Sequence, residues 1–364
     1  MSLDVRPFTP ALAASWDAVA ADSDDAWFWQ TRRWIDWIVE RSGDDVIADA
    51  SFVVTQDADM TAICPLVVER GPDGPQFAFN GNPIAAPAIR NGIGRAGRQE
   101  VFALYAETCA AIAATYDVRY GAVKVPALCR AFLGAPLPFA HPLRRFGYFD
   151  VSWLTQIIDL ADDDEQLWAG LRKGHKADVK RARRQLDARA WRGAELPAGT
   201  FAAYREMHAR DAGRVIRSTR TFDIMERWVR EGHAALVEAF TPDGRPAAFA
   251  LLLLNKDGAF YGSGCREPEL ASLPASHLVQ WTAMTWLKAQ GFRYYDLGLQ
   301  QFGPQAYEVP SPKDVAIAGF KRGFGGETVP LPTAERFYSA ELLEETFARR
   351  ARAAAAALPQ GVPS

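Results

Sequence analysis

Basic side chains are concentrated in one stretch of the sequence, where they could bind phosphate groups. Residues 171–220 include 14 Lys and Arg and 5 Asp and Glu, a local net charge of +9 in a 364-residue chain whose net charge is −3. Such a local excess attracts polyanions. Lys173, Lys176, Lys180 and Arg184 are at helical spacing and would share one helix face. We predict that a phosphate-bearing substrate binds to Lys173, Lys176, Lys180 and the neighbouring Arg181. A solvated helix face is the alternative interpretation.

Two arginines after the next predicted helix could hold an anionic group. Arg210 and Arg217 are two of the four arginines between residues 210 and 220. A guanidinium group binds phosphate or carboxylate through a planar fork of N–H donors. Arg210 lies three residues after Met207, on the same helix face, so we expect it to be partly buried and to need a partner. That partner is either a substrate anion or a carboxylate of the protein.

A segment near the C-terminus places two aromatic residues and two cations between glycines. Its sequence from residue 320 is Phe-Lys-Arg-Gly-Phe-Gly-Gly. Glycines let a backbone approach a ligand closely, and a helix that ends in a glycine cap is the alternative. The ammonium group of Lys321 could stabilise the negative charge that develops on a carbonyl oxygen during acyl transfer.

Other residues of chemical interest have spacings that exclude several kinds of site. The four cysteines and five histidines have no metal-binding or redox spacing, so we predict no metal. Neither GxSxG nor GxxxxGK[ST] occurs, which argues against a serine hydrolase of that type and a P-loop. The segment 92–97 matches GxGxxG. We interpret it as a loop before a helix, because two prolines in the preceding segment suit no central strand.

The apolar segments of the sequence are short. The longest purely apolar run, Ala247–Leu254, has eight residues. A membrane-spanning helix needs roughly 20. The N-terminus lacks the apolar core of a signal peptide. We therefore expect a cytoplasmic protein without an integral membrane segment.

Helices and short strands alternate along the chain and must position these residues. Helices are predicted over 27–40, 98–116, 164–186, 200–212, 274–290 and 340–358. Strands are predicted over 47–55, 61–70, 120–126, 155–160, 235–240, 247–254, 259–264 and 293–299. Hairpins interrupt the βαβ pattern, which favours a mixed α+β fold with a domain junction near Gly147.

Several stretches together resemble the FemABX family of peptidyl and aminoacyl transferases. Gly81-Asn82-Pro83-Ile84 is similar to the family's N-terminal Gly-x-Pro-Ile turn. The stretch Phe320–Gly325 resembles its C-terminal signature and is the most specific piece. The other matching stretches are Leu167–Leu171 with Lys180-Arg181-Ala182, Tyr204–Gly213, Tyr261–Gly264, Pro274, Leu278–Trp281 and Gly291–Gly298. The resemblance spans most of the chain.

This resemblance implies two tandem GNAT-like (acyl-CoA N-acyltransferase-like) domains, each a mostly antiparallel sheet flanked by helices. The first would span 1–147 and be completed by a segment near 330–364, and the second would span 148–329. The family likeness further implies transfer of an aminoacyl or acyl group to an amine, with no cofactor beyond the donor, aminoacyl-tRNA or acyl-CoA. The acceptor would be a small-molecule or lipid-linked amine of a peptidoglycan or other cell-envelope precursor, and tRNA would be a partner if it carries the donor.

By resemblance and by chemistry, Lys321 is the best candidate for stabilising the oxyanion. Phe320 would then shape the pocket, Tyr261 would carry or orient a proton, and Arg210 would hold a phosphate of the acceptor. The sequence departs from the family at two points. The segment 34–38 has no lysine where family members place one near the acceptor's phosphates, and the acyl-CoA loop [RQ]xxGx[GA] has only a near match at 91–96.

Two other classes of function remain open from the sequence. A non-catalytic phosphate- or polyanion-binding protein on a degenerate transferase fold would account for the stretch of charge +9. A dinucleotide-dependent oxidoreductase would rest only on the GxGxxG match at 92–97. The sequence predicts no particular oligomeric state.

Overall fold

The computed structural model describes residues 3–57, 59–134 and 140–357, which form two compact units. Unit 1 consists of Met1–Leu154, Gln301–Ala318 and Pro330–Ser364, and unit 2 of Thr155–Gln300 and Gly319–Val329. The junction predicted near Gly147 lies inside unit 1. Residues 301–318, which we predicted in the second domain, also pack in unit 1, where the Tyr307 hydroxyl donates to the Ser152 carbonyl oxygen at 2.7 Å. No helix among the described residues is long and apolar enough to cross a membrane.

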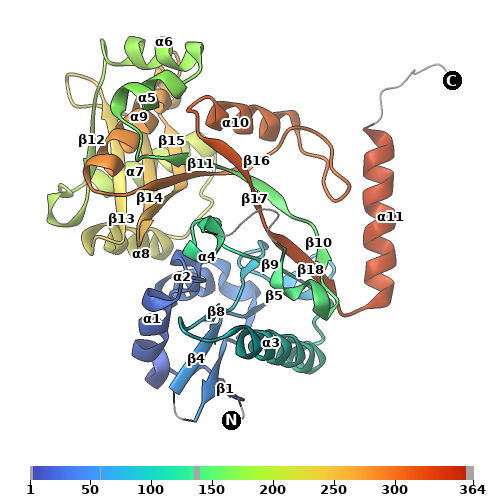
Figure 1. The fold of residues 1–364 in the computed structure, drawn as a ribbon. Coiled ribbons are helices and arrows are strands. Elements are labelled where there is room, and N and C mark those ends of the chain that lie inside the picture. Colours follow the sequence, from blue (N-terminus) through green and yellow to red (C-terminus); the bar gives the residue numbers. More distant parts are fainter. Residues whose placement is uncertain (1–2, 58, 135–139, 358–364) are drawn as a thin grey trace. The chain divides into compact units, whose positions relative to one another are not determined.

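The first sheet of unit 1 has four antiparallel strands. Its elements are β1 (Leu3–Pro7), α1 (Ala13–Asp22), β3 (Phe52–Gln56), β4 (Asp59–Cys64), β8 (Ala88–Ile89) and α3 (Arg95–Tyr116). The strand order is β1-β3-β4-β8. Helix α1 packs on β4 and β8, and α3 packs on β1, on a different side of the sheet (Figure 1). The first half of the GxGxxG segment, residues 92–94, is the loop before α3, whose N-cap is Gly94, and its second half begins the helix.

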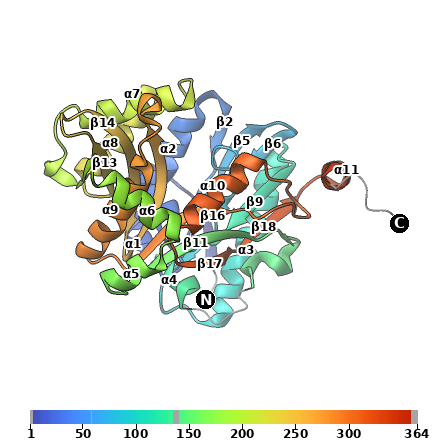
Figure 2. The same cartoon turned by 90° about the horizontal axis from the view of Figure 1, so that it is seen from above.

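The second sheet of unit 1 has the order β10-β18-β9-β6-β5-β2, and β7 also pairs with β9. The strands are β2 (Val46–Asp49), β5 (Val67–Gly71), β6 (Gly74–Phe77), β7 (Ile84–Ala85), β9 (Tyr120–Lys124), β10 (Phe149–Asp150) and β18 (Thr333–Phe337). Helix α11 (Ala340–Ala356), seen nearly end-on in Figure 2, is tied to β18 by two bonds of 2.6 and 2.7 Å between Arg350 and the buried Glu335. The end predicted for this helix, Leu358, lies outside the described residues.

The strands predicted over 47–55 and 61–70 are each broken in two. The predicted strand 47–55 consists of β2 and β3, and the predicted strand 61–70 consists of β4 and β5. Each predicted strand therefore contributes to both sheets of unit 1. Ser51 lies at the break: its hydroxyl contacts the carbonyl oxygen of Leu66 at 3.4 Å and accepts from the Leu66 N–H at 3.1 Å. Periodicity did not reveal the break because apolar residues continue on both sides of it.

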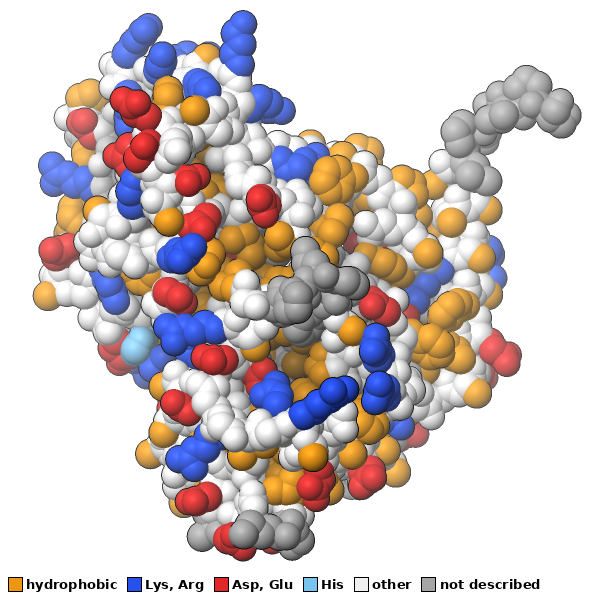
Figure 3. All heavy atoms as spheres, in the orientation of Figure 1, with side chains coloured by type: hydrophobic (Ala, Val, Ile, Leu, Met, Phe, Trp, Pro, Cys, Tyr) orange, Lys and Arg blue, Asp and Glu red, His pale blue; other side chains and the backbone are white. Residues whose placement is uncertain are grey.

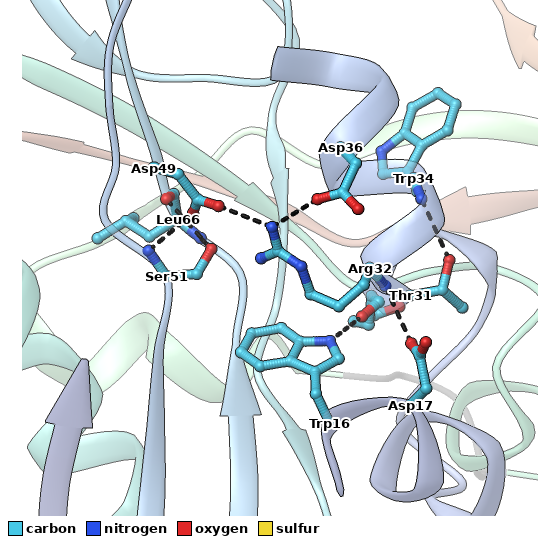
Figure 4. A network of polar contacts seen from close by, with 10 residues as sticks. Trp16, Asp17, Thr31, Arg32, Trp34, Asp36, Asp49, Ser51 and Leu66 are labelled. Atoms are coloured by element: carbon cyan, nitrogen blue, oxygen red, sulfur yellow. Dashed lines mark hydrogen bonds and ion pairs between the residues drawn. The ribbon is translucent and has the colours of Figure 1, made fainter. Parts of the chain in front are cut away.

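A buried arginine fixes the start of α2 (Arg32–Ser42), which begins later than the predicted helix over 27–40. Arg32 Nη2 bonds Asp36 at 2.7 Å and Asp49, the last residue of β2, at 2.8 Å (Figure 4). Its guanidinium carbon lies 3.9 Å from the centroid of the Phe8 ring. The two carboxylates compensate a charge that would otherwise be costly to bury.

Unit 2 is built on one seven-stranded sheet of order β12-β13-β14-β15-β16-β11-β17. Helix α9 packs on β12, β13 and β14 and also contacts α6. Helix α7 packs on β15 and helix α8 on β13, both from the other side of the sheet (Figure 2). The bounds are β11 Trp153–Asp159, α5 Asp164–Gly170, α6 Lys173–Ala182, β12 Asp187–Trp191, α7 Thr200–Ala212, α8 Thr219–Arg230, β13 Ala234–Phe240, β14 Pro246–Asn255, β15 Gly258–Arg266, α9 Ala275–Ala289, β16 Tyr294–Gln300, α10 Pro312–Arg322 and β17 Glu327–Leu331.

Unit 2 differs from the sequence prediction in several elements. The helix predicted over 164–186 is two helices, α5 and α6, because the N–H of Arg172 donates to the carbonyl oxygen of Gly323 at 2.9 Å instead of continuing the helix. Helix α8 and strand β12 were not predicted. The sequence did hold a signal for α8, since Ser218 caps it and its buried residues follow helical spacing.

The chain after α10 lies so close to other elements of unit 2 that side chains would not fit. A Cβ on Gly323 would overlap the imidazole of His175 on α6. A Cβ on Gly326, where φ is +76°, would overlap the carbonyl oxygen of Ile157 on β11. These glycines therefore serve close packing within the protein, not the approach to a ligand that we considered from the sequence.

Replacing Gly323 by Ala should destabilise the protein, and the same change at Gly319 should not. The added methyl group at Gly323 forces His175 to move, an overpacking that costs about 2 kcal/mol. At Gly319, within α10, the nearest atom to a new Cβ is 3.8 Å away, so Ala should be neutral or stabilise the helix by up to about 1 kcal/mol. Urea unfolding of both variants measures the difference, and equal midpoints would contradict the packing argument.

Candidate functional site

Two neighbouring strands of unit 2 separate partway along their length. Among the described residues, β15 and β16 pair in parallel only from Gly258↔Tyr294 to Phe260↔Asp296. Beyond this point β15 continues to Arg266 and β16 to Gln300. The unpaired halves of the two strands therefore border an opening in the sheet, and several of the predicted site residues lie beside it.

Lys321 lies on the β16 side of this opening. It belongs to the last turn of α10, and its Nζ is 3.2 Å from the position that a Cβ on Gly298 would take. The described residues form no hydrogen bond or ion pair with this Nζ. Burial lowers the pKa of Lys321, and the carboxylate of Asp296 opposes that effect. The site thus contains a partly buried ammonium group whose donors are available.

Phe320 packs into an aromatic cluster that also contains His175, His277 and Phe324. The centroid of its ring is 5.5 Å from that of His175, 5.0 Å from that of His277 and 5.1 Å from that of Phe324. The Nε2–H of His175 donates to the carbonyl oxygen of Phe320 at 2.9 Å, so this nitrogen carries the proton. The cluster joins α6, α9 and the end of α10, and it supports Lys321 from the neighbouring position.

Tyr261 lies on β15, one residue past the last pair with β16. Burial raises its pKa to about 12, so the phenol stays protonated at neutral pH. Its hydroxyl folds over Gly264, where a Cβ would overlap it. The side chain packs against the hydrophobic core. It can therefore donate a hydrogen bond at neutral pH, but it does not act there as a base.

The two predicted anion-binding arginines have different partners. Arg210 bonds the buried carboxylate of Glu267 at 2.9 Å, which is the internal ion pair that we gave as the alternative. Arg217 has no carboxylate partner among the described residues: its Nη1 bonds His208 Nε2 at 2.8 Å and Ser263 Oγ at 3.2 Å. Among the described residues, the buried Nε of Arg217 has no hydrogen-bond partner.

The predicted basic residues Lys173, Lys176, Lys180 and Arg181 all lie on α6. Lys and Arg side chains gather around this helix at the top of Figure 3. Lys173, Lys180 and Arg181 are exposed, whereas Lys176 Nζ donates to the carbonyl oxygen of Ala169 at 2.8 Å. Arg181 pairs with Asp178 at 3.2 Å. Most of these charges therefore face solvent, as both interpretations of the sequence require.

Two cavities formed by described residues of unit 1 contain none of the predicted site residues. The first, of about 390 Å³, is lined by Tyr120, Tyr307 and Arg350 together with other residues of α11 and β6. A second, of about 480 Å³, lies between α1 and the first sheet. No group of three or more metal-ligating side chains occurs within the part of the chain that the structure describes.

Sequence analysis missed five polar residues that surround the candidates. Asp296, Glu267, Tyr204 and the His175–His277 pair each contact or face a predicted residue. Asp296 had a visible signal, because it lies in a predicted strand two residues before Gly298. Glu267 gave none, since its partner Arg210 lies 57 residues away in sequence.

Comparison with known proteins relates part of the chain to one family. Residues 173–308 match the family model described as "Acetyltransferase (GNAT) domain". Phe320 and Lys321 lie outside the matched residues. Comparison with curated proteins found no significant match.

Solved structures that resemble the whole chain are distant in sequence. FemX is 13% identical, with a TM-score of 0.64 over 94% of this chain and 99% of that one. L-PGS from Bacillus licheniformis is 12% identical, with a TM-score of 0.60 over 94% and 96%. A tandem GNAT protein from the clavulanic acid biosynthesis pathway is 12% identical, with a TM-score of 0.50 over 93% and 99%. At such identities the likeness concerns the fold, and it confirms the predicted α+β architecture of tandem GNAT-like domains.

Acid should destabilise unit 2 through its histidine pair. Burial, and then the neighbouring His175, Arg172 and Arg181, lower the pKa of His277 to about 4, although Asp178 opposes the shift. Burial also lowers the pKa of His175. Because the unfolded chain binds these protons near pH 6.5, the stability is present above pH 6.5 and is lost as the pH falls towards 4.

His277→Gln should make this loss less steep. One proton fewer is then bound on unfolding, which changes the slope by at most about 1.4 kcal/mol per pH unit. The measurement is the free energy of unfolding in urea from pH 7.5 to 4.5, taken as the difference between the variant and the wild type at each pH. Parallel curves would show that His277 does not titrate on unfolding.

Proposed function

We propose that the GNAT domain makes this protein an acyltransferase that moves an aminoacyl or acyl group from an activated ester or thioester to an amine. The observation that carries the proposal is the partly buried ammonium group of Lys321, which lies beside the opening between β15 and β16 without a hydrogen-bond partner among the described residues. A transferase needs such a donor where charge develops.

In this reaction the amine nitrogen attacks the carbonyl carbon of the donor. The new C–N bond forms a tetrahedral intermediate, and its negative oxygen is stabilised by the ammonium group of Lys321. The C–O or C–S bond then breaks, the amine loses its proton, and the alcohol or thiol leaves protonated. No serine or cysteine nucleophile is required, and the four cysteines are buried. Catalysis rests on positioning and on electrostatic stabilisation.

Phe320 and Tyr261 support this role in different ways. Phe320 fixes the end of α10 through the aromatic cluster and so shapes the surroundings of Lys321. Tyr261, protonated at neutral pH, would orient a substrate by donating a hydrogen bond. Neither residue needs to change its charge during the reaction.

Arg217 is the better candidate of the two arginines for binding a substrate anion. Arg210 already has the carboxylate of Glu267, whereas Arg217 brings an uncompensated charge to Ser263 on β15. A buried charge without a counter-charge is costly, and an anion supplied by the substrate would remove that cost. Phosphate and carboxylate both meet this requirement.

The donor and the acceptor define the experiment that tests the proposal. Purified protein is incubated with labelled aminoacyl-tRNA or acyl-CoA and a set of amines that includes peptidoglycan precursors and aminolipid precursors. Transfer of label to any amine supports the proposal, and use of aminoacyl-tRNA should depend on Lys173 and Lys180, which are exposed on α6. If neither donor is consumed with any amine, the proposal fails.

A non-catalytic polyanion-binding protein is the second candidate, and the exposed charges of α6 favour it. Such a protein would bind tRNA or another polyanion with strong salt dependence. It would do so equally well after loss of Lys321. The two candidates thus differ in what a change at Lys321 does.

Lys321→Ala should lower the turnover number by roughly 10² to 10³, the loss typical of one oxyanion donor. The KM values should change little, because the interaction forms mainly in the transition state. Lys321→Arg should restore part of the rate, since its planar fork differs in shape from an ammonium group. Steady-state kinetics with the donor identified above measures these effects.

Lys321→Met serves as the control for packing, because it keeps an unbranched side chain of similar length. It should be as inactive as the Ala variant while unfolding at the wild-type urea midpoint. If the Ala variant keeps its turnover number and only its KM rises, Lys321 binds a substrate phosphate instead.

Arg217→Ala should raise the KM of the anionic substrate by about 10- to 100-fold, the loss expected for hydrogen bonds to a charged group. The turnover number should change much less. Arg214→Ala is the matched control, because Arg214 is exposed in the same connection between α7 and α8. Equal KM values in the two variants would exclude a specific role for Arg217.

A further inference from the structure

Asp296 is a buried carboxylate at the point where β15 and β16 separate. It forms the last pair with Phe260 and is only 5% exposed. One of its oxygens, Oδ1, accepts from the Thr155 hydroxyl at 2.5 Å and from the Gly298 N–H at 2.7 Å. These two bonds fix the carboxylate in one orientation.

The same carboxylate shapes the surface on which Lys321 lies. Its bond to the Gly298 N–H closes a turn in which Gly298 has a φ of +84°, a value suited to glycine. A Cβ at this position would be 3.2 Å from Lys321 Nζ and 3.5 Å from the Phe260 ring. The missing side chain therefore makes room for the ammonium group.

The described elements of unit 2 near Lys321 carry four charged or titratable groups: Asp296 on β16, Arg322 on α10, Tyr261 on β15 and His175 on α6. Arg322 is bonded to Gln300 at 3.0 Å. Among these groups only Asp296 acts on the pKa of Lys321, and it raises that pKa against the effect of burial. Asp296 is thus the counter-charge of the lysine.

We propose that Asp296 is a positioning residue for Lys321: it fixes the Gly298 turn against which the lysine lies and supplies a negative charge that acts on the partly buried ammonium group. Only the effect of this positioning on catalysis rests on the proposed function. The coupling between the two charges is a property of unit 2 and can be measured without any substrate.

The first experiment measures the titration of Lys321 in the full chain by NMR, after isotopic methylation of the lysines. The chain has eight lysines, so the Lys321 signal is assigned by its loss in Lys321→Arg. In Asp296→Asn, an isosteric change, the pKa of Lys321 should fall by about one unit or more. In Thr155→Val, which keeps the charge, the shift should be smaller. An unchanged Lys321 pKa in folded Asp296→Asn would overturn the proposal.

The reciprocal experiment covers the case in which Asp296→Asn does not fold. Coupling is mutual, so removing the charge in Lys321→Met must raise the pH at which the Asp296 carboxyl group protonates. Infrared spectroscopy of the carboxyl band, with Asp labelled by ¹³C, measures that pH in the wild type and the variant. No change in the Asp296 titration would overturn the proposal independently of the first experiment.

Activity provides the third readout and separates this proposal from the proposed function. If the protein is an acyltransferase, Asp296→Asn should shift the alkaline limb of its turnover–pH profile to lower pH by the same amount as the NMR shift. Asp296→Glu should restore part of that shift. If Asp296→Asn changes the pKa of Lys321 but no donor is consumed, Asp296 is a positioning residue for Lys321 and the proposed transferase activity is wrong.

Discussion

The absence of a side chain at Gly323 is the constraint on which the candidate site depends. Because the backbone at Gly323 lies against the imidazole of His175, the chain after α10 can reach β11 directly. The same approach allows the N–H of Arg172 to bond the Gly323 carbonyl oxygen, which ends α5 and starts α6 separately. The end of α10, and with it Lys321, is therefore fixed by packing several residues away from the lysine itself.

Unit 2 deals with its buried titratable groups in two opposite ways. The pair His175 and His277 loses its charge, since burial lowers the pKa of both and the neighbouring arginines favour the neutral form of His277. Lys321 is treated differently, because the Asp296 carboxylate opposes the effect of burial. Neutral rings can pack closely against Phe320 and Phe324, whereas a charged ammonium needs a counter-charge and space. Both requirements are met at adjacent residues of α10, where Phe320 packs into the aromatic cluster and Lys321 carries the charge.

The sequence predicted the elements of this site better than it predicted their partners. Strands β15 and β16 and the cation at Lys321 were visible, because alternation and glycine spacing are local properties. The break between α5 and α6 was not, because it depends on Gly323, about 150 residues further along the chain. The break in the two predicted strands near Ser51 was missed for a similar reason. Both halves of each predicted strand are apolar, so the pattern does not show that they belong to different sheets. Helix α8 is a different case, because its cap and its apolar spacing could have been found.

The two arginines show why residue type alone does not identify a binding group. Arg210 and Arg217 are seven residues apart and have the same chemistry, yet among the described residues only Arg210 pairs with a carboxylate. The difference comes from β15, which brings Glu267 to Arg210 and the uncharged Ser263 to Arg217. A charge already compensated within the fold gains little from a ligand, whereas an uncompensated one gains the full interaction. Strand β15 thereby determines which of the two arginines has its charge compensated within the fold.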